Sequence, residues 1–265
     1  PCPSPSLSRG LILPLLHRSP RAAWVAHPRQ NPDWQPRSQD KFDLGVSAHA
    51  LLLDESQDGI VVVQAEDWRT KAAKEQRDEA HAAGKAALLE HQFREALGMV
   101  DVAREFLASS DLADPSGSDS EQTILWSEDG VWLRARVDRL SKDRMVICDY
   151  KTTEDASPVG FARTIAALGY HIQDAFYRRA VRALGGPDPR FVFLAQETEP
   201  PYQCALHGCD NTLQAIGEAT VERAIALWRR CLERNEWPGY GGRIYAAPAP
   251  MWLVAQHESL IASGE

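Results

Sequence analysis

Two strand-like runs in the middle of the chain carry acidic side chains and a lysine at spacings that suit phosphodiester hydrolysis. Asp138 lies near the end of the run 130–140, and Asp149 and Lys151 lie in the run 146–153. Carboxylate oxygens bind hard cations such as Mg²⁺ or Mn²⁺, which lower the pKa of an attacking water. A neighbouring lysine can orient that water or neutralise the developing charge. These residues therefore predict metal-assisted phosphodiester cleavage.

The turn between the two runs decides whether the acids share a face. We expect Leu140 to pair with Met145 across a polar turn. Because side chains alternate along a strand, this register puts Asp138 opposite Ile147 and diagonal to Asp149. Diagonal neighbours lie roughly 7–8 Å apart at Cα, a separation that two carboxylates can bridge through one cation. A two-residue loop would leave this parity unchanged, whereas a three-residue loop would put Asp138 on the other face and remove the site.

A third strand-like run places one more acid on the same face. Glu121 opens the run 121–126, and the alternation of side chains puts it on the face of Arg136 and Asp138. The other face of the run 146–153 is apolar, so this strand is expected to be buried on both sides. Three acids, one lysine and one arginine then converge on a single patch.

Some of these residues also have simpler interpretations. Isolated Asp-x-Lys triplets are common on solvated strand faces, but Asp149 and Lys151 occupy an otherwise apolar strand, where unpaired charges are costly to bury. His49 lies near the end of an apolar helical run, and a lone histidine there is more often part of a core than a metal ligand. The residues alone leave both interpretations of His49 open.

The motifs occur in an order typical of one nuclease group. In chain order they are Gly45-x-x-x-His49, Arg136-Val137-Asp138, Asp149-Tyr150-Lys151-Thr152-Thr153, and Gln173 with Tyr177. This order resembles the PD-(D/E)XK nuclease superfamily, and most closely its RecE (exonuclease VIII) branch, the relatives of lambda exonuclease and of the RecB nuclease domain. The resemblance extends over residues 19–253.

The resemblance implies a role for each motif. The implied metal ligands are His49, Asp138, Asp149 and the backbone carbonyl of Tyr150. The implied catalytic residues are Lys151, Asp149, Asp138, Glu121, Gln173 and Tyr177, with the last two bracing the site from the following helix. Asp149 stands where many members of the superfamily have Glu. The expected cofactor is Mg²⁺ or Mn²⁺.

The helix that carries the bracing pair has a clear start signal. Ser157 is a good N-cap and Pro158 a good first helical residue, so we expect one helix over 159–184. Gln173 and Tyr177 lie one turn apart on it. Because a buried amide needs a hydrogen-bond partner, Gln173 is expected to face the site.

Length and composition favour one elaborated domain. With 265 residues and 44% apolar content the chain can bury a substantial core. We expect an α/β fold with a restriction-endonuclease-like core, a central mixed β-sheet flanked by helices, over residues 19–265. Residues 1–18 are rich in proline and are expected to form a poorly ordered arm. Their apolar run is too short to span a membrane, so no membrane association is expected.

Charge and cysteine content bear on partners and compartment. The net charge is −8, but the placement of charge matters more than its sum. We expect Arg136, Arg139 and Arg21 to contact DNA. Five cysteines and the lack of a secretory signal favour free thiols in a reducing cytoplasm, and their spacing does not favour an iron–sulfur cluster.

The expected activity is metal-dependent exonucleolysis of linear double-stranded DNA. By resemblance, digestion runs 5′ to 3′ and leaves a 3′ single strand for a single-strand-annealing protein, and a ring-shaped homo-oligomer, trimer or tetramer, encircles the DNA end. Two alternatives stay open. One is a nuclease of different polarity or substrate, closer to RecB or Cas4, and the other is a catalytically silent scaffold that binds DNA ends.

Overall fold

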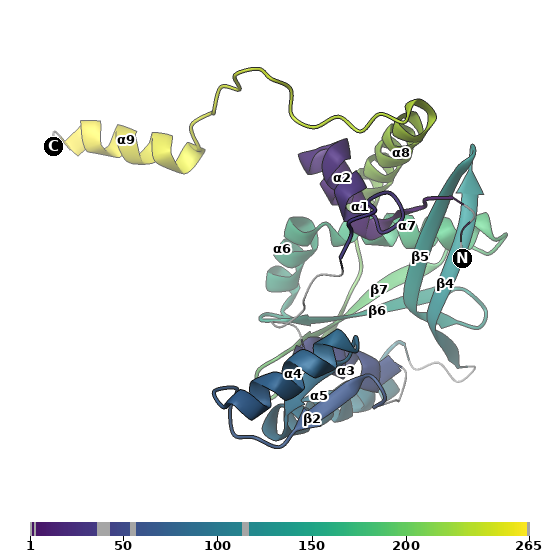
Figure 1. Ribbon diagram of the computed structural model, residues 1–265, viewed down its shortest axis with the longest axis vertical. Coiled ribbons are helices and arrows are strands. Elements are labelled where there is room, and N and C mark those ends of the chain that lie inside the picture. The colour runs from purple at the N-terminus through teal and green to yellow at the C-terminus, as the bar shows by residue number, and fades with distance from the viewer. Residues whose placement is uncertain (1, 3, 36–42, 54–56, 113–116, 264–265) are drawn as a thin grey trace.

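The computed structural model describes residues 2, 4–35, 43–53, 57–112 and 117–263 (Figure 1). Its main sheet has six strands in the order β1-β5-β6-β7-β8, with β4 on the other edge of β5. The strands are β1 Leu7–Ser8, β4 Ser118–Glu128, β5 Val131–Ser141, β6 Val146–Thr153, β7 Arg190–Glu197 and β8 Cys204–His207. A separate parallel pair is formed by β2 Ile60–Val63 and β3 Ala86–Leu89.

Helices cover both faces of this sheet (Figure 1). The helices of the described part of the chain are α1 Arg9–Leu13, η1 Pro14–Arg18, α2 Pro20–Ala26, α3 Asp43–Leu53, α4 Lys71–Ala82, α5 Glu90–Ala108, α6 Pro158–Leu168, α7 Tyr170–Ala183, α8 Asn211–Arg234 and α9 Met251–Ser263. The larger core lies between the sheet and α1, α6, α7 and α8, whereas α3 and α5 enclose a smaller core on the other face. The expected central mixed sheet flanked by helices is confirmed.

The strand β6 runs between the two cores. Ile147 belongs to the larger core, while Cys148 and Tyr150 belong to the smaller one. The neighbouring strand β7 lies parallel to β6, with Asp149 paired to Phe193. Burial on both sides, predicted from the apolar run, is confirmed, and any charge on this strand must find its partners inside the protein.

The β4–β5–β6 meander follows from its turns. Asp129 and Gly130 form a two-residue hairpin loop in which both have positive φ, 47° and 80°, as a type I′ turn requires. The next turn shifts the predicted register, because Leu140 pairs with Ile147 rather than with Met145. The alternation of faces is unchanged by this shift, so the acids of β5 and β6 still share a face.

Two other expectations need correction. Residues 7–18 are not a poorly ordered arm, since Leu7 pairs with Leu133 and the side chains of Leu7, Ile12 and Leu15 are buried in the larger core. The prolines that suggested disorder are compatible with this path because Pro14 stands in the first turn of η1. Residues 1 and 3 lie outside the described residues.

The expected single helix over 159–184 is two helices. Gly169 adopts a left-handed conformation with φ 67° between α6 and α7. A Cβ atom at this position would stand 3.2 Å from Leu13 of α1. A glycine therefore suits both the backbone turn and the close approach of the N-terminal segment.

The C-terminal helix α9 projects away from the body of the protein (Figure 1). Its apolar residues Met251, Trp252 and Ile261 are exposed. Among the helices of the described part of the chain, none combines the length and the apolar character that a membrane span requires.

Candidate active site

The candidate site opens where β6 separates from β5. Along one edge of β5, β1 pairs at Leu133 and β6 pairs at Arg139 and Leu140. Just beyond the β6 pairs, a side chain replaces the backbone partner, because the Asp138 carboxylate accepts a hydrogen bond of 3.0 Å from the Tyr150 N–H. This bond holds Asp138 at the split between the strands.

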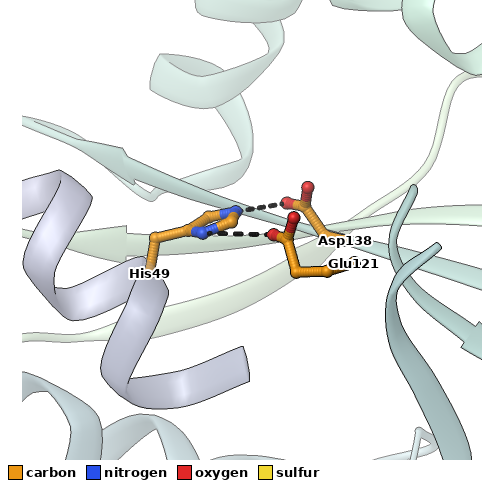
Figure 2. Close-up of side chains that lie close together, drawn as sticks. All are labelled: His49, Glu121 and Asp138. Atoms are coloured by element: carbon orange, nitrogen blue, oxygen red, sulfur yellow. Dashed lines mark ion pairs between the residues drawn. The ribbon is translucent and has the colours of Figure 1, made fainter. Parts of the chain in front are cut away.

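The helix α3 brings His49 over this split. Gly45 lies close to β6, and a Cβ atom there would stand 2.9 Å from Thr152 Oγ1. Ala48 is fully buried in the smaller core and anchors the helix. One turn after Gly45, His49 Nε2 reaches Asp138 Oδ2 at 3.1 Å (Figure 2). The motif spacing thus corresponds to one close helix–strand contact.

Glu121 completes a group of three ligand-type side chains. Its carboxylate Oε1 lies 3.6 Å from His49 Nδ1 (Figure 2). The pairs Gln122–Val137 and Ser120–Arg139 on either side place Glu121 opposite Asp138. Glu121 has φ 56°, a conformation that is strained for a residue with a side chain and is frequent at functional sites.

The three side chains form a candidate cation site, which we call the open triad: His49, Glu121 and Asp138. One ligand atom from each lies within 4.8 Å of the others. Two carboxylates and an imidazole fit a divalent cation, and the imidazole makes Mn²⁺ as suitable as Mg²⁺. The acidic excess at the site, with Asp149 nearby, favours a cation further.

A second group lies deeper, and we call it the buried pair: the fully buried Asp149 and the half-buried Lys151. Asp149 has no exposed surface, and its carboxylate contacts the Lys151 ammonium and accepts a hydrogen bond from Gln173. Tyr177, one turn further along α7, lies within hydrogen-bond reach of Gln173. The predicted bracing role of Gln173 thus has a direct contact with the buried acid.

The charged groups of the site shift one another's pKa values. Burial, together with the nearby Asp138 charge, raises the pKa of Asp149 to about 6, although Lys151 opposes this. Burial alone would lower the pKa of His49, but Asp138, Glu121 and Asp149 outweigh it and raise the pKa. Burial would likewise lower the pKa of Lys151, and Asp149 and Asp138 raise it. Lys151 is therefore a cation at neutral pH.

The predicted DNA-contacting arginines lie in different places. Arg136 is largely exposed and pairs with Glu121 beside the triad. Arg139 contacts Ser118 and lines a cavity of about 860 Å³ next to Tyr150. Arg21 instead packs over the Trp24 ring at 4.3 Å in α2, a helix that lies far from α3 in Figure 1.

Tyr150 and Gln196 form a support that the sequence analysis missed. The Tyr150 hydroxyl donates to Gln196 Oε1 at 2.6 Å, and the Gln196 amide donates to the Met99 carbonyl at 2.9 Å. Gln196 is fully buried. Its position in the apolar run of β7 was a usable signal, since a buried amide needs partners. Because the Tyr150 side chain is engaged here, only its backbone carbonyl is available to the site.

Comparisons with known proteins bear on the family and the fold of the chain. Residues 18–248 match a family described as a PDDEXK-like domain of unknown function (DUF3799). The crystal structure of a putative exonuclease from Eubacterium rectale is similar over 94% of this chain and 92% of that chain, with 12% identity and a TM-score of 0.59. That likeness shows the shared fold, a restriction-endonuclease-like core.

Other comparisons add little. The structure of SSO0001 aligns over 71% of this chain and 85% of that chain with 12% identity, but its TM-score of 0.31 is too low to indicate a shared fold. No curated protein matches the sequence significantly. The family match covers most of the chain and includes every residue of the open triad and the buried pair. The chain therefore belongs to the PDDEXK-like family DUF3799.

Proposed function

We propose that this protein is a divalent-metal-dependent nuclease that degrades linear double-stranded DNA from its ends. One observation carries the proposal: the open triad and the buried pair, which come from α3, β4, β5 and β6, meet at one split in the sheet. Cation ligands next to a half-buried lysine form an arrangement that can hydrolyse phosphodiesters. The PDDEXK-like family supports the nuclease class.

The open triad would hold the cation, Mg²⁺ or Mn²⁺. Asp149 is the next carboxylate, opposite Asp138 by the extended register of β5 and β6, and by resemblance it is the second acidic ligand, with the Tyr150 carbonyl completing the shell. When bound, the cation would act as a Lewis acid toward the phosphate and lower the pKa of a nearby water.

The remaining chemistry falls to the chain's own side chains. Lys151 donates hydrogen bonds and positive charge, so it can orient the attacking water or neutralise charge that develops on the phosphate oxygens. Asp149 holds the Lys151 ammonium in place, and Gln173 holds Asp149. Asp138 is fixed by the Tyr150 N–H, so the site is organised before substrate arrives.

The substrate and assembly rest on resemblance. The fold shared with the Eubacterium rectale protein, whose name includes exonuclease, supports action at DNA ends, and Arg136 and Arg139 lie beside the site. We propose 5′ to 3′ digestion that leaves a 3′ single strand for a single-strand-annealing protein. A ring-shaped homo-oligomer would keep the enzyme on its DNA.

A digestion assay tests the proposal. Blunt linear duplexes labelled at either end, with 5′-phosphate or 5′-hydroxyl, are incubated with Mg²⁺ or Mn²⁺ and with EDTA. We expect cation-dependent release of nucleotides from the 5′ end and little cleavage of closed circular DNA. Release from the 3′ end would favour the RecB-like or Cas4-like alternative. Binding of ends without release in either cation would favour the silent scaffold.

A further inference from the structure

The aromatic ring of Tyr170 lies beside the buried pair, at the first residue of α7. Lys151 Nζ stands 5.2 Å from the centre of this ring, within the range in which the negative face of an aromatic ring attracts a cation. Asp149 contacts the same ammonium. Lys151 is therefore held by a carboxylate and by a ring.

The ring itself is held rigidly by the larger core. Tyr170 stacks on Phe193 with centroids 5.6 Å apart and an angle of 27° between the planes, and Phe161 lies 6.1 Å away. Both phenylalanines are fully buried. Phe193 pairs with Asp149 across β6 and β7. The ring that contacts Lys151 therefore packs on the same pair of strands that carries the acid.

The N-terminal segment reaches the same ring. The Arg9 guanidinium lies 5.6 Å from the Tyr170 centroid and donates hydrogen bonds to the carbonyls of Leu168 and Gly169, at 2.8 and 3.3 Å. These carbonyls belong to the end of α6, where a cation is favourable. Leu13 packs against the Gly169 turn. The segment thus fixes the corner from which Tyr170 projects.

We propose that Tyr170 is a positioning residue for Lys151 and that Arg9 supports it from the N-terminal segment. This inference rests on the proposed function. A lysine side chain has four rotatable bonds, and Asp149 restrains only its end. The ring adds a second restraint, which limits the directions that the ammonium can take toward the reacting phosphate.

Two substitutions of Tyr170 separate positioning from packing. Tyr170→Phe keeps the ring, whereas Tyr170→Leu keeps apolar bulk without it. We expect kcat for Mn²⁺-dependent digestion to fall about tenfold in Tyr170→Leu and to stay within about twofold of the parent in Tyr170→Phe. KM for DNA should stay within about twofold of the parent in both variants.

Arg9→Met tests the N-terminal support without removing the ring. We expect a smaller fall in kcat, about threefold. The matched control is Arg18→Met, which removes an exposed arginine of the same segment and should leave kcat unchanged. If Tyr170→Leu lowers the thermal midpoint strongly, Arg9→Met and Tyr170→Phe still test the idea, since both keep the aromatic core.

A spectroscopic measurement tests the contact without relying on cleavage. In protein labelled with ¹³C at lysine Cε, the Lys151 signal is assigned by its loss in Lys151→Arg. We expect ring currents to displace it in the parent and in Tyr170→Phe, and expect it to return to the exposed-lysine position in Tyr170→Leu. An undisplaced signal in the folded parent, or a Tyr170→Leu variant with parental kcat, would overturn the inference. A displaced signal in a parent that never cleaves DNA would instead refute the proposed nuclease function.

Discussion

The open triad and the buried pair lie side by side but differ in how their charges are balanced. In the buried pair, Asp149 has no exposed surface and is matched by Lys151 and Gln173. In the open triad, Glu121 and Asp138 share one imidazole, whose side chain is 31% exposed, and the facing Arg136 is largely in solvent.

This difference separates two requirements of the site. The buried pair is matched within the chain, so it can be rigid without any ligand. In the open triad two carboxylates face one imidazole, which binds a metal in its neutral form, so a divalent cation would offset the negative charge that remains. Four changes can break or sharpen this contrast, beginning with the two that act on cleavage, where the largest effects are expected.

Removing the Lys151 ammonium should abolish most of the activity. Lys151→Ala is expected to lower kcat by about 10²- to 10³-fold, because the charge that develops on the phosphate loses its nearest protein cation. Single-turnover digestion of end-labelled duplex measures the loss. The control is Lys85→Ala, which removes an exposed lysine between α4 and β3. Parental cleavage by Lys151→Ala would show that this lysine has no role in the chemistry.

Neutralising a carboxylate of the open triad should weaken cation binding. Asp138→Asn and Glu121→Gln are each expected to lower Mn²⁺ affinity at least about tenfold, measured by isothermal titration calorimetry, and Asp138→Asn should abolish cleavage. Asp138→Asn keeps an oxygen for the Tyr150 N–H, so the fold should be largely spared. Asp119→Asn, an exposed position of β4, serves as the control. Unchanged Mn²⁺ affinity in Asp138→Asn would exclude it as a ligand.

Adding or removing the cation should change stability only through the open triad. At about 100 times the dissociation constant, Mn²⁺ is expected to stabilise the folded state by about 2.7 kcal/mol, a rise of several degrees in the thermal midpoint that EDTA reverses. A tenfold loss of affinity would leave Asp138→Asn only about half of this stabilisation, about 1.4 kcal/mol, whereas Asp119→Asn should show all of it. A parental rise in Asp138→Asn would place the bound cation elsewhere.

Glu128 is an ion-paired carboxylate outside the site. It is expected to give the smallest effect and serves as a reference for the site residues. Burial alone would raise the pKa of Glu128, but hydrogen bonds from Arg179 and Trp126 outweigh it and lower the pKa. Its stabilisation is therefore complete above the pKa of the unfolded state and is lost as pH falls through the lower folded-state pKa.

Glu128→Gln should remove this pH-dependent part. Relative to the parent, we expect a loss of about 1–2 kcal/mol of unfolding free energy at pH 7, shrinking toward zero below about pH 4. Urea denaturation at both pH values measures it. A difference that does not depend on pH would mean that the ion pair is not the source of the stabilisation.

Much of the site was predictable because strand geometry is local. Asp138 and Asp149 share a face because the register shifts by two residues, with Leu140 paired to Ile147 rather than to Met145, and a shift of two leaves the alternation unchanged. Glu121 came to the same face by the same count. The split of the sheet, which exposes Asp138 to α3, was not predictable, because it depends on β6 following β7 away from β5.

The expectations that failed depended on distant contacts. Residues 7–18 are ordered by pairing with β5 and by packing against the larger core. The break at Gly169 depends on the approach of Leu13. Neither contact can be read from the segment alone, since each partner lies more than a hundred residues away. Gly169 itself was a usable local signal, since glycine often ends a helix, but the contacts that fix both segments could not be read from composition or local propensity.

By itself, the sequence determined the chemical groups and the faces on which β4, β5 and β6 present them, because side-chain alternation needs only the local backbone. The tertiary structure alone decided that His49 meets Glu121 and Asp138, that Gln196 supports Tyr150, and that Tyr170 lies between Arg9 and Lys151. These contacts depend on how helices pack against a split sheet, and packing is set by the whole core rather than by any one segment.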